Sequence, residues 1–266
     1  MKRFLPKGTR IGHTGTLDPM ASGLLVLLIG RATRLSRYVM NLDKSYTATA
    51  RFGAVSDTLD ADGDITNLGT PLPSEAAIRE ALPDFTGDLL QIPPMASALK
   101  REGTRLYDLH RRGISVEREP RQVKIHNFEL TGIDPIEERA TFEVSCSSGT
   151  YIRSLVADLA AHLGSSAYLT ALRRTSVGHL CLTDAHTLQD LNPVTLHNRI
   201  IPHDKVVGHL PGVRVSEGER ALICHGGRIE RRGIEGSYRV MCGGELLAVY
   251  RDDDDGGRAE VVLCAK

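Results

Sequence analysis

The sequence lacks several features that would each define a class of protein. Its 33 basic and 33 acidic side chains cancel, so overall charge gives no reason to expect a nucleic-acid partner, which must be inferred from local patches. The five cysteines are scattered and include no Cys-x-x-Cys pair, which disfavours a disulfide framework or a zinc site. The longest apolar run, Leu24 to Ile29, is too short to span a bilayer, and the N-terminus carries no apolar stretch of a secretory signal. We therefore expect a soluble protein of the reducing cytoplasm.

The hydrophobic patterns predict a chain of mixed α and β structure. Its 266 residues allow one large domain or two unequal ones. Helical spacing predicts helices over 32–40, over 75–82 after Ser74 as N-cap, and over 152–163 before Gly164. In the first of these helices, Leu35, Val39 and Met40 are expected on one side. Strands are predicted over 24–29, 45–52, 123–130, 140–146, 238–241, 245–250 and 259–263.

The pattern changes around residues 192–209, which contain Pro and His without clear periodicity. Such a change is typical of a boundary between domains. Beyond it, two segments rich in turn-forming residues, 242–244 and 252–257, separate the last three predicted strands. We therefore expect a small β-rich domain at the C-terminus.

The most informative stretch runs from Gly12 to Pro19 and reads Gly-His-Thr-Gly-Thr-Leu-Asp-Pro. It puts one carboxylate, Asp18, in a loop beside the predicted strand 24–29, where a rigid scaffold would present a reactive group. Taken alone, Asp18 could equally be a turn residue that bonds its own backbone before Pro19. The segments that follow it along the chain therefore decide how the loop is interpreted.

Several such segments follow in a fixed order: Asp43-Lys44-Ser45-Tyr46, residues 56–63, Gln91-Ile92-Pro93-Pro94, residues 97–100, residues 148–155 and Leu172-Arg173-Arg174-Thr175. Together with the Gly-His loop they resemble the TruB family of tRNA pseudouridine synthases, from about Gly8 to the C-terminus. The resemblance implies an α+β fold: a mixed, mainly antiparallel sheet with flanking helices over 1–205, an RNA-binding insertion at about 91–124, and a small β-barrel, PUA-like domain over 206–266. It also implies a monomer that binds the T-arm of tRNA without cofactor, metal or membrane.

The implied reaction converts a T-loop uridine, at tRNA position 55, to pseudouridine. It breaks the bond from ribose C1′ to N1 and rejoins the uracil through C5. A carboxylate suits this chemistry because it can attack a carbon and leave again. The resemblance assigns that role to Asp18. It assigns Arg153 to pairing with the carboxylate, which would keep Asp18 ionised and oriented, and Tyr46 to stacking and proton transfer at C5.

Four further residues are implied to bind the substrate: His13, Lys44, Tyr151 and Leu172. His13 would fill the space that the flipped uridine leaves in its stack, and Tyr151 and Leu172 would shape the uracil pocket. Each has a structural alternative. His13 could make one hydrogen bond within its loop, Tyr151 and Leu172 could pack in the core, and Lys44 could be a solvated charge.

The segment 100–124 is the best local candidate for RNA contact. It contains eight basic side chains and only four acidic ones. The basic ones are Lys100, Arg101, Arg105, Arg111, Arg112, Arg118, Arg121 and Lys124, and the acidic ones are Glu102, Asp108, Glu117 and Glu119. A solvated charged face is the alternative interpretation. If several of these Arg residues contact phosphates, binding will depend strongly on salt.

Two local patterns point to other functions but lack their partners. Ser97 and Lys100 match the Ser-x-x-Lys of penicillin-recognising acyl transferases without the companion motifs. Residues 60–64 hint at a calcium loop, yet the glycine comes too early and no Glu closes it. The chain also begins only about eleven residues before Gly12, so we expect the true start to lie upstream of Met1. A truncated, catalytically impaired protein that binds tRNA or assists its folding is therefore the alternative function.

Overall fold

The computed structural model describes residues 1–97, 99–101 and 103–264, and the chain forms two compact units. One unit contains residues 17–24 and 41–183, and is called the sheet unit below. The other contains residues 1–16, 25–40 and 184–266, and is called the terminal unit. Among the described residues, no helix is both long and apolar enough to cross a membrane.

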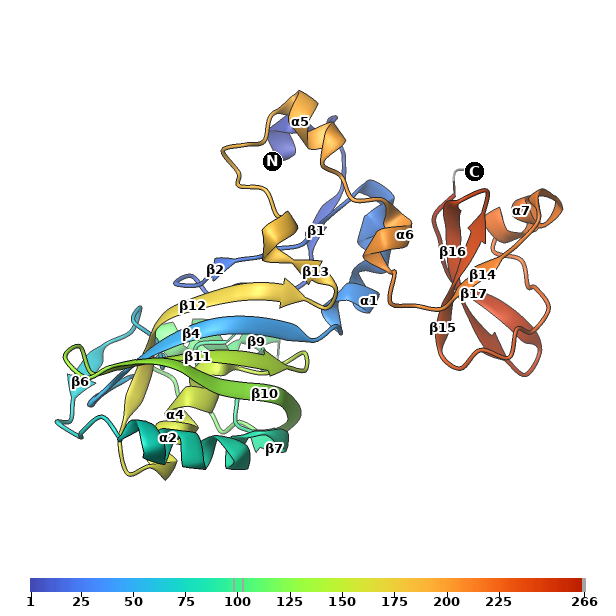
Figure 1. Cartoon of the computed structure of the whole chain (residues 1–266). Coiled ribbons are helices and arrows are strands. Elements are labelled where there is room, and N and C mark those ends of the chain that lie inside the picture. Colours follow the sequence, from blue (N-terminus) through green and yellow to red (C-terminus); the bar gives the residue numbers. More distant parts are fainter. Residues whose placement is uncertain (98, 102, 265–266) are drawn as a thin grey trace. The chain divides into compact units, whose positions relative to one another are not determined.

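The sheet unit is built on one seven-stranded sheet (Figure 1). Its main path runs in the order β13-β12-β4-β11-β10-β7, with every neighbouring pair antiparallel. The strands are β4 (Lys44–Phe52), β7 (Gly87–Gln91), β10 (Arg121–Asp134), β11 (Arg139–Cys146), β12 (Ala167–Val177) and β13 (Leu180–Cys181). The short β2 (Ser22–Gly23) pairs in parallel with β12. The prediction of a mixed, mainly antiparallel sheet is confirmed.

Two helices pack against this sheet and form one core with it, and both lie on the same side of it in Figure 1. The helix α2 (Glu75–Ala81) begins as predicted, because the backbone N–H of Ala77 donates to Ser74 Oγ at 3.2 Å. The helix α4 (Ile152–His162) ends before Gly164, whose φ of +68° suits glycine. Its apolar side contributes Leu155, Val156 and Leu159 to the core.

The remaining elements of the sheet unit are short. They are β5 (Ala54–Ser56), β6 (Ile65–Asn67), η3 (Leu82–Phe85), β8 (Lys100–Arg101), β9 (Thr104–Arg105), α3 (Leu106–Arg111) and η4 (Leu182–Asp184).

The strand predicted over 24–29 is only partly present. The chain passes from one unit to the other between Leu24 and Leu25. Leu24 N–H bonds the Arg174 carbonyl in the sheet unit at 2.8 Å, whereas β3 (Leu27–Ile29) pairs with β1 (Ile11–His13) in the terminal unit. One apolar run therefore serves two sheets.

The helix predicted over 32–40 is split, and the prediction for Met40 was wrong. A 3₁₀ helix, η2 (Gly30–Leu35), precedes the α-helix α1 (Ser36–Met40). Leu35 and Val39 are fully buried, but Met40 is 47% exposed. Val39 and Met40 are neighbours in the α-helical part, where successive side chains point about 100° apart, so Met40 turns away from the core that Val39 faces.

The terminal unit contains the three C-terminal strands that the sequence predicts. They are β15 (Ser237–Cys242), β16 (Glu245–Asp253) and β17 (Gly256–Val262), and β14 (Gly212–Arg214) adds in parallel to β15. Within the described residues these four strands form an open sheet in the order β14-β15-β16-β17. The predicted closed barrel is not found. The unit also holds η1 (Lys2–Phe4), α5 (Pro193–Asn198), α6 (His203–Val206) and α7 (Glu217–Cys224).

A disulfide in this unit corrects the interpretation of the cysteines. Cys224, at the end of α7, and Cys264, after β17, have their sulfur atoms 2.12 Å apart and are separated by 40 residues in sequence. Spacing rules detect local pairs, whereas this pair forms because α7 contacts β17. Cys146, Cys181 and Cys242 are free.

Candidate active site

The loop that carries Asp18 is anchored to the central sheet by β2. Gly23 adopts a φ of +97°, and a Cβ there would lie 2.3 Å from the Arg174 carbonyl oxygen. Only glycine allows this close approach of two backbones. The N–H of Ala21 also bonds the Asp18 carbonyl at 2.9 Å. These contacts fix the part of the loop that carries Asp18 to β12 of the sheet unit.

Arg153 meets that carboxylate from the first turn of α4. Its Nε lies 2.9 Å from Asp18 Oδ2, and its Nη1 lies 3.0 Å from Asp60 Oδ2. Two backbone carbonyls fix the guanidinium further, since Nη1 donates to Thr58 O at 2.7 Å and Nη2 to Ala96 O at 2.9 Å. The Arg153 and Asp60 side chains are 3% and 4% exposed, whereas that of Asp18 is 33% exposed. Of these three groups, only Asp18 is open to a substrate.

Asp60 is a site residue that the sequence analysis missed. Its Oδ1 accepts hydrogen bonds from Thr58 Oγ1 at 2.6 Å and from the Asp62 N–H at 3.1 Å. Its Oδ2 remains for Arg153, so both oxygens have partners. Nothing in the local sequence distinguishes Asp60 from the exposed Asp62 or Asp64.

The charges of this cluster act in opposite directions on Asp18. Burial raises the pKa of Asp18 most, Arg153 lowers it, and the negative charge of Asp60 raises it again. The net result is a pKa above the ordinary value. Arg153 therefore favours the ionised carboxylate, as expected, but burial outweighs it.

Tyr46 and Lys44 lie on β4, opposite residues of β12. Tyr46 pairs with Arg174 in the ladder, and Lys44 with Val177. Burial raises the pKa of Tyr46 to about 12, with a further contribution from the Asp18 charge, so the phenol is protonated at neutral pH. Lys44 is buried and donates to the Leu42 carbonyl. Burial, together with the Arg174 charge, lowers the pKa of Lys44 to about 8.

The start of α4 holds a second polar group that the sequence analysis did not identify. Gln91 is 4% exposed, and its amide makes two hydrogen bonds to the backbone of Tyr151. Gln91 Nε2 donates to Tyr151 O at 3.0 Å, and Tyr151 N–H donates to Gln91 Oε1 at 2.7 Å. Gln91 was part of a matching segment but received no role. Its contacts are long-range, so only the folded chain shows what it holds.

The other predicted substrate residues lie in different surroundings. Tyr151 is partly buried and lies in electrostatic range of Asp18 and Arg153. Leu172 is 6% exposed and belongs to the sheet core. His13 lies in the terminal unit, on β1, with its side chain exposed.

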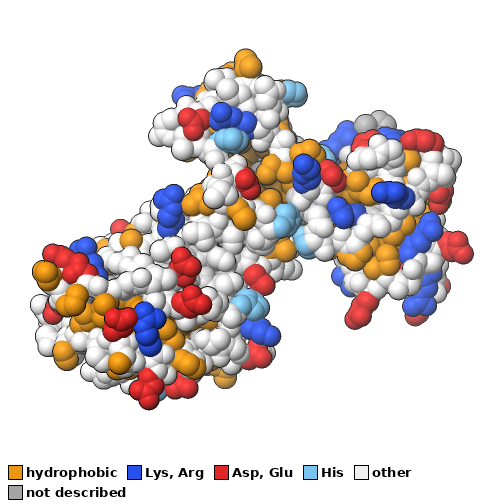
Figure 2. Space-filling view, in the orientation of Figure 1, with side chains coloured by type: hydrophobic (Ala, Val, Ile, Leu, Met, Phe, Trp, Pro, Cys, Tyr) orange, Lys and Arg blue, Asp and Glu red, His pale blue; other side chains and the backbone are white. Residues whose placement is uncertain are grey.

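The predicted RNA-binding segment is partly engaged in local contacts. Its Glu102 lies outside the described residues, as do the side chains of Lys100, Arg101 and Arg105. Arg118 donates to the Pro93 carbonyl at 3.0 Å, and the Arg111 guanidinium lies 5.4 Å from the centre of the Tyr107 ring. On the face in Figure 2, basic and acidic side chains are interspersed.

Within the part of the chain that the structure describes, no group of three or more His, Cys, Asp or Glu residues could hold a metal ion. The site described above therefore consists of one accessible carboxylate, a guanidinium that binds it, a second buried carboxylate and a neutral phenol.

In comparisons with known proteins, two family models together match residues 2–207. The family model described as TruB family pseudouridylate synthase (N terminal domain) matches residues 2–152, and that of the tRNA pseudouridylate synthase B C-terminal domain matches residues 153–207. The chain is 43% identical to tRNA pseudouridine synthase B of Azoarcus sp. (strain BH72), over 93% of the chain and 83% of the relative. It is 40% identical to the protein of that name from Aromatoleum aromaticum, over 96% and 83%.

A solved structure has a similar fold. An H/ACA ribonucleoprotein bound to a substrate RNA containing 2′-deoxyuridine gives a TM-score of 0.70 at 22% identity, covering 96% of this chain and 77% of the other. At that identity, the likeness concerns the fold alone.

Proposed function

Because the chain belongs to the TruB family of pseudouridine synthases and is a tRNA pseudouridine synthase, we propose that it isomerises the uridine at position 55, in the T-loop of tRNA, and that Asp18 is its essential carboxylate. The observation that carries the proposal is the Arg153 guanidinium, which is held by two backbone carbonyls and by Asp60 and pairs with an accessible Asp18. An acid that served only to close a turn would need no such support.

The reaction requires Asp18 in its ionised form, whether it attacks a carbon or removes a sugar proton. The C1′–N1 bond breaks, the uracil turns, C5 bonds to C1′, the C5 proton leaves and N1 takes up a proton, so the step is an isomerisation and no oxidant or reductant is needed. Arg153 orients the carboxylate and stabilises its charge. Because the Tyr46 phenol is neutral at working pH, it serves as a stacking surface and a hydrogen-bond donor for the uracil.

The remaining predicted residues have supporting roles in the proposal. Tyr151, at the start of α4, and Leu172, on β12, shape the uracil pocket. Lys44, on β4, helps to bind the substrate. His13 fills the space from which the uridine is flipped.

RNA binding is divided between two regions in the proposal. The insertion at about 91–124 contacts the T-arm, and residues 206–266 act as a PUA-like RNA-binding domain after the catalytic domain 1–205. The supports are the excess of basic residues over 100–124 and the β-rich C-terminal sheet. Because its substrate is tRNA, we expect the protein to act in the cytoplasm. We also expect it to act as a monomer.

The proposal is tested by tritium release from an unmodified tRNA transcript that carries C5-tritiated uridine, because C5 loses its hydrogen when it bonds to C1′. We expect release to stop at about one equivalent per tRNA and to vanish in Asp18→Ala. Asp62→Asn is the matched control, since it removes an exposed carboxylate nearby that does not contact Arg153; it should retain turnover.

Two results would contradict the proposal. Release that persists in Asp18→Ala would exclude Asp18 as the essential carboxylate. A folded chain that binds tRNA without releasing tritium would instead support a protein that only binds tRNA. Sequencing the modified transcript locates the target and checks position 55.

A further inference from the structure

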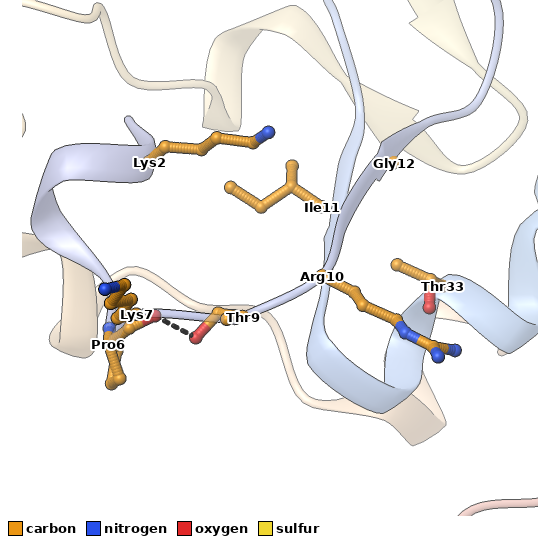
Figure 3. A pocket seen from close by; sticks show the side chains of 9 residues that line it. Lys2, Pro6, Lys7, Thr9, Arg10, Ile11, Gly12 and Thr33 are labelled. Atoms are coloured by element: carbon orange, nitrogen blue, oxygen red, sulfur yellow. Dashed lines mark hydrogen bonds between the residues drawn. The ribbon is translucent and has the colours of Figure 1, made fainter.

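A cavity of about 670 Å³ lies in the terminal unit, outside the site described above (Figure 3). It is formed by η1, the turn that follows it, the start of β1, and Thr33 of η2. Three of its nine lining residues are the cations Lys2, Lys7 and Arg10, and none is acidic. The cavity therefore carries a local positive charge in a chain whose formal net charge is zero.

These three cations are free to meet an external anion. In the described parts of the chain, none of them forms a side-chain hydrogen bond or an ion pair, and all three side chains are exposed. The sequence up to Leu17 contains a further cation, Arg3, and no Asp or Glu. No carboxylate lines the cavity, and none of the three cations is paired within the described residues, so the group attracts anions.

The turn between η1 and β1 has a defined shape that fixes Lys7 and leads directly into Arg10. Thr9 donates twice to the Pro6 carbonyl, from N–H at 3.1 Å and from Oγ1 at 2.7 Å. Gly8 has a φ of +88°, as required at the third position of a type II turn. Figure 3 shows Lys2 lying beside Ile11 and Arg10 extending towards Thr33.

We propose that this cavity, called the N-terminal basic pocket, binds phosphate groups of the tRNA substrate. The inference rests on the proposed function. Arg10 directly precedes β1, and His13 ends that strand. At about 3.3 Å per residue, the Arg10 and His13 backbones lie roughly 10 Å apart along the strand. An RNA strand bound at His13 is therefore within reach of the pocket.

The size and lining of the pocket suit a nucleotide better than a single ion. A volume of about 670 Å³ lies within the roughly 300–1,000 Å³ of small-molecule sites. Lys2, Lys7 and Arg10 supply charge for phosphodiester oxygens. Pro6 and Ile11 supply apolar surface that a ribose can cover.

The test is the salt dependence of tRNA binding. Each phosphate contact contributes about 0.7 to 0.9 to the slope of log affinity against log salt. We expect the triple variant Lys2→Ala/Lys7→Ala/Arg10→Ala to lower the absolute slope by about 2 to 3. Its maximal single-turnover rate at saturating tRNA should stay unchanged. Arg79→Ala removes an exposed cation of α2 and should leave the slope as it is, whereas Lys7→Ala alone should lower it.

Further variants separate charge from folding. Lys2→Arg/Lys7→Arg/Arg10→Lys keeps all three charges and should keep the slope, while Lys7→Glu should weaken binding more than Lys7→Ala. An unchanged slope and KM in a folded triple variant would contradict phosphate binding in the N-terminal basic pocket, although turnover by the wild type would still support the proposed function. Conversely, a wild type that makes no pseudouridine but loses tRNA affinity in the triple variant would overturn the proposed function alone.

Discussion

Replacing Asp60 by Asn tests whether Arg153 needs its second carboxylate. The substitution preserves the shape of the side chain and an acceptor for Thr58 Oγ1, but it removes the buried charge 3.0 Å from Arg153 Nη1. Breaking a buried ion pair from one side costs about 3–5 kcal/mol when the remaining charge is left without a partner. Arg153 keeps Asp18 and two carbonyls, so we expect a loss of about 2–3 kcal/mol in unfolding free energy.

Asp60→Asn should change catalysis in two ways, one seen in kcat and the other in the pH dependence of the rate. Once Asp60 no longer holds it, the guanidinium can shift and move Asp18 with it, and a displacement of about 1 Å costs on the order of 100-fold in kcat. The charge effect is separate. Because the Asp60 charge raises the pKa of Asp18, its removal lowers that pKa. The Asp18 carboxylate then stays ionised to lower pH, so the acid limb of the pH–rate profile shifts to lower pH.

The assay is tritium release under single-turnover conditions across the acidic pH range, with urea unfolding of the same samples. Asp62→Asn is the control, since the Asp62 charge acts on Asp18 in the same direction but more weakly. It should shift the acid limb less and keep kcat. Wild-type kcat and an unmoved acid limb in a folded Asp60→Asn protein would refute the reasoning.

Three further predictions concern other parts of the chain. Gln91→Ala removes both hydrogen bonds to the Tyr151 backbone and should cost about 1–3 kcal/mol and lower kcat more than it raises KM; Gln91→Glu, which places a buried carboxylate oxygen against the Tyr151 carbonyl, should cost at least as much. Because the pKa of Lys44 falls from 10.5 to about 8 on folding, the unfolded chain binds more protons between those values. On its own, this group should make stability rise with pH there by about 3 kcal/mol in total, whereas Cys146, whose pKa burial raises from 9.0 to about 11, acts in the opposite direction; the difference in unfolding free energy between wild type and Lys44→Met, from urea titrations, should therefore show the rise. Reducing the Cys224–Cys264 disulfide opens a closure of 40 residues, worth about 4 kcal/mol in the chain-entropy view, and should lower the melting temperature of wild type but not of Cys224→Ser.

Local patterns predicted the elements whose cause is local. The alternation of β4, the helical period of α4 and the cap at Ser74 can each be read within one turn or one strand, and the structure confirms all three. The apolar run from Leu24 to Ile29 was misjudged because its two ends pair with different partners. Periodicity identifies a buried run, but it does not show which strand the run will pair with.

The candidate site shows the same division between local and distant causes. Motif order selected Asp18 and Arg153, and the structure brings them to 2.9 Å. It did not select Asp60 or Gln91, whose partners lie 93 and 60 positions away along the chain. Their importance comes from burial and from the partner each reaches. Both properties exist only after the loops meet at the start of α4.

In the mechanism proposed above, the contacts of Arg153 both orient Asp18 and affect how readily its carboxylate reacts. One guanidinium serves two carboxylates, so the cluster keeps a net negative charge when both are ionised. If Asp18 alone paired with Arg153, its pKa would lie lower, and the carboxylate would be more stable and less ready to react. Sharing the guanidinium with Asp60, together with burial, raises the pKa of Asp18, while the carbonyls of Thr58 and Ala96 keep Arg153 in place. The orientation of Asp18 thus comes from buried contacts, and its partial exposure leaves the carboxylate open to the proposed substrate.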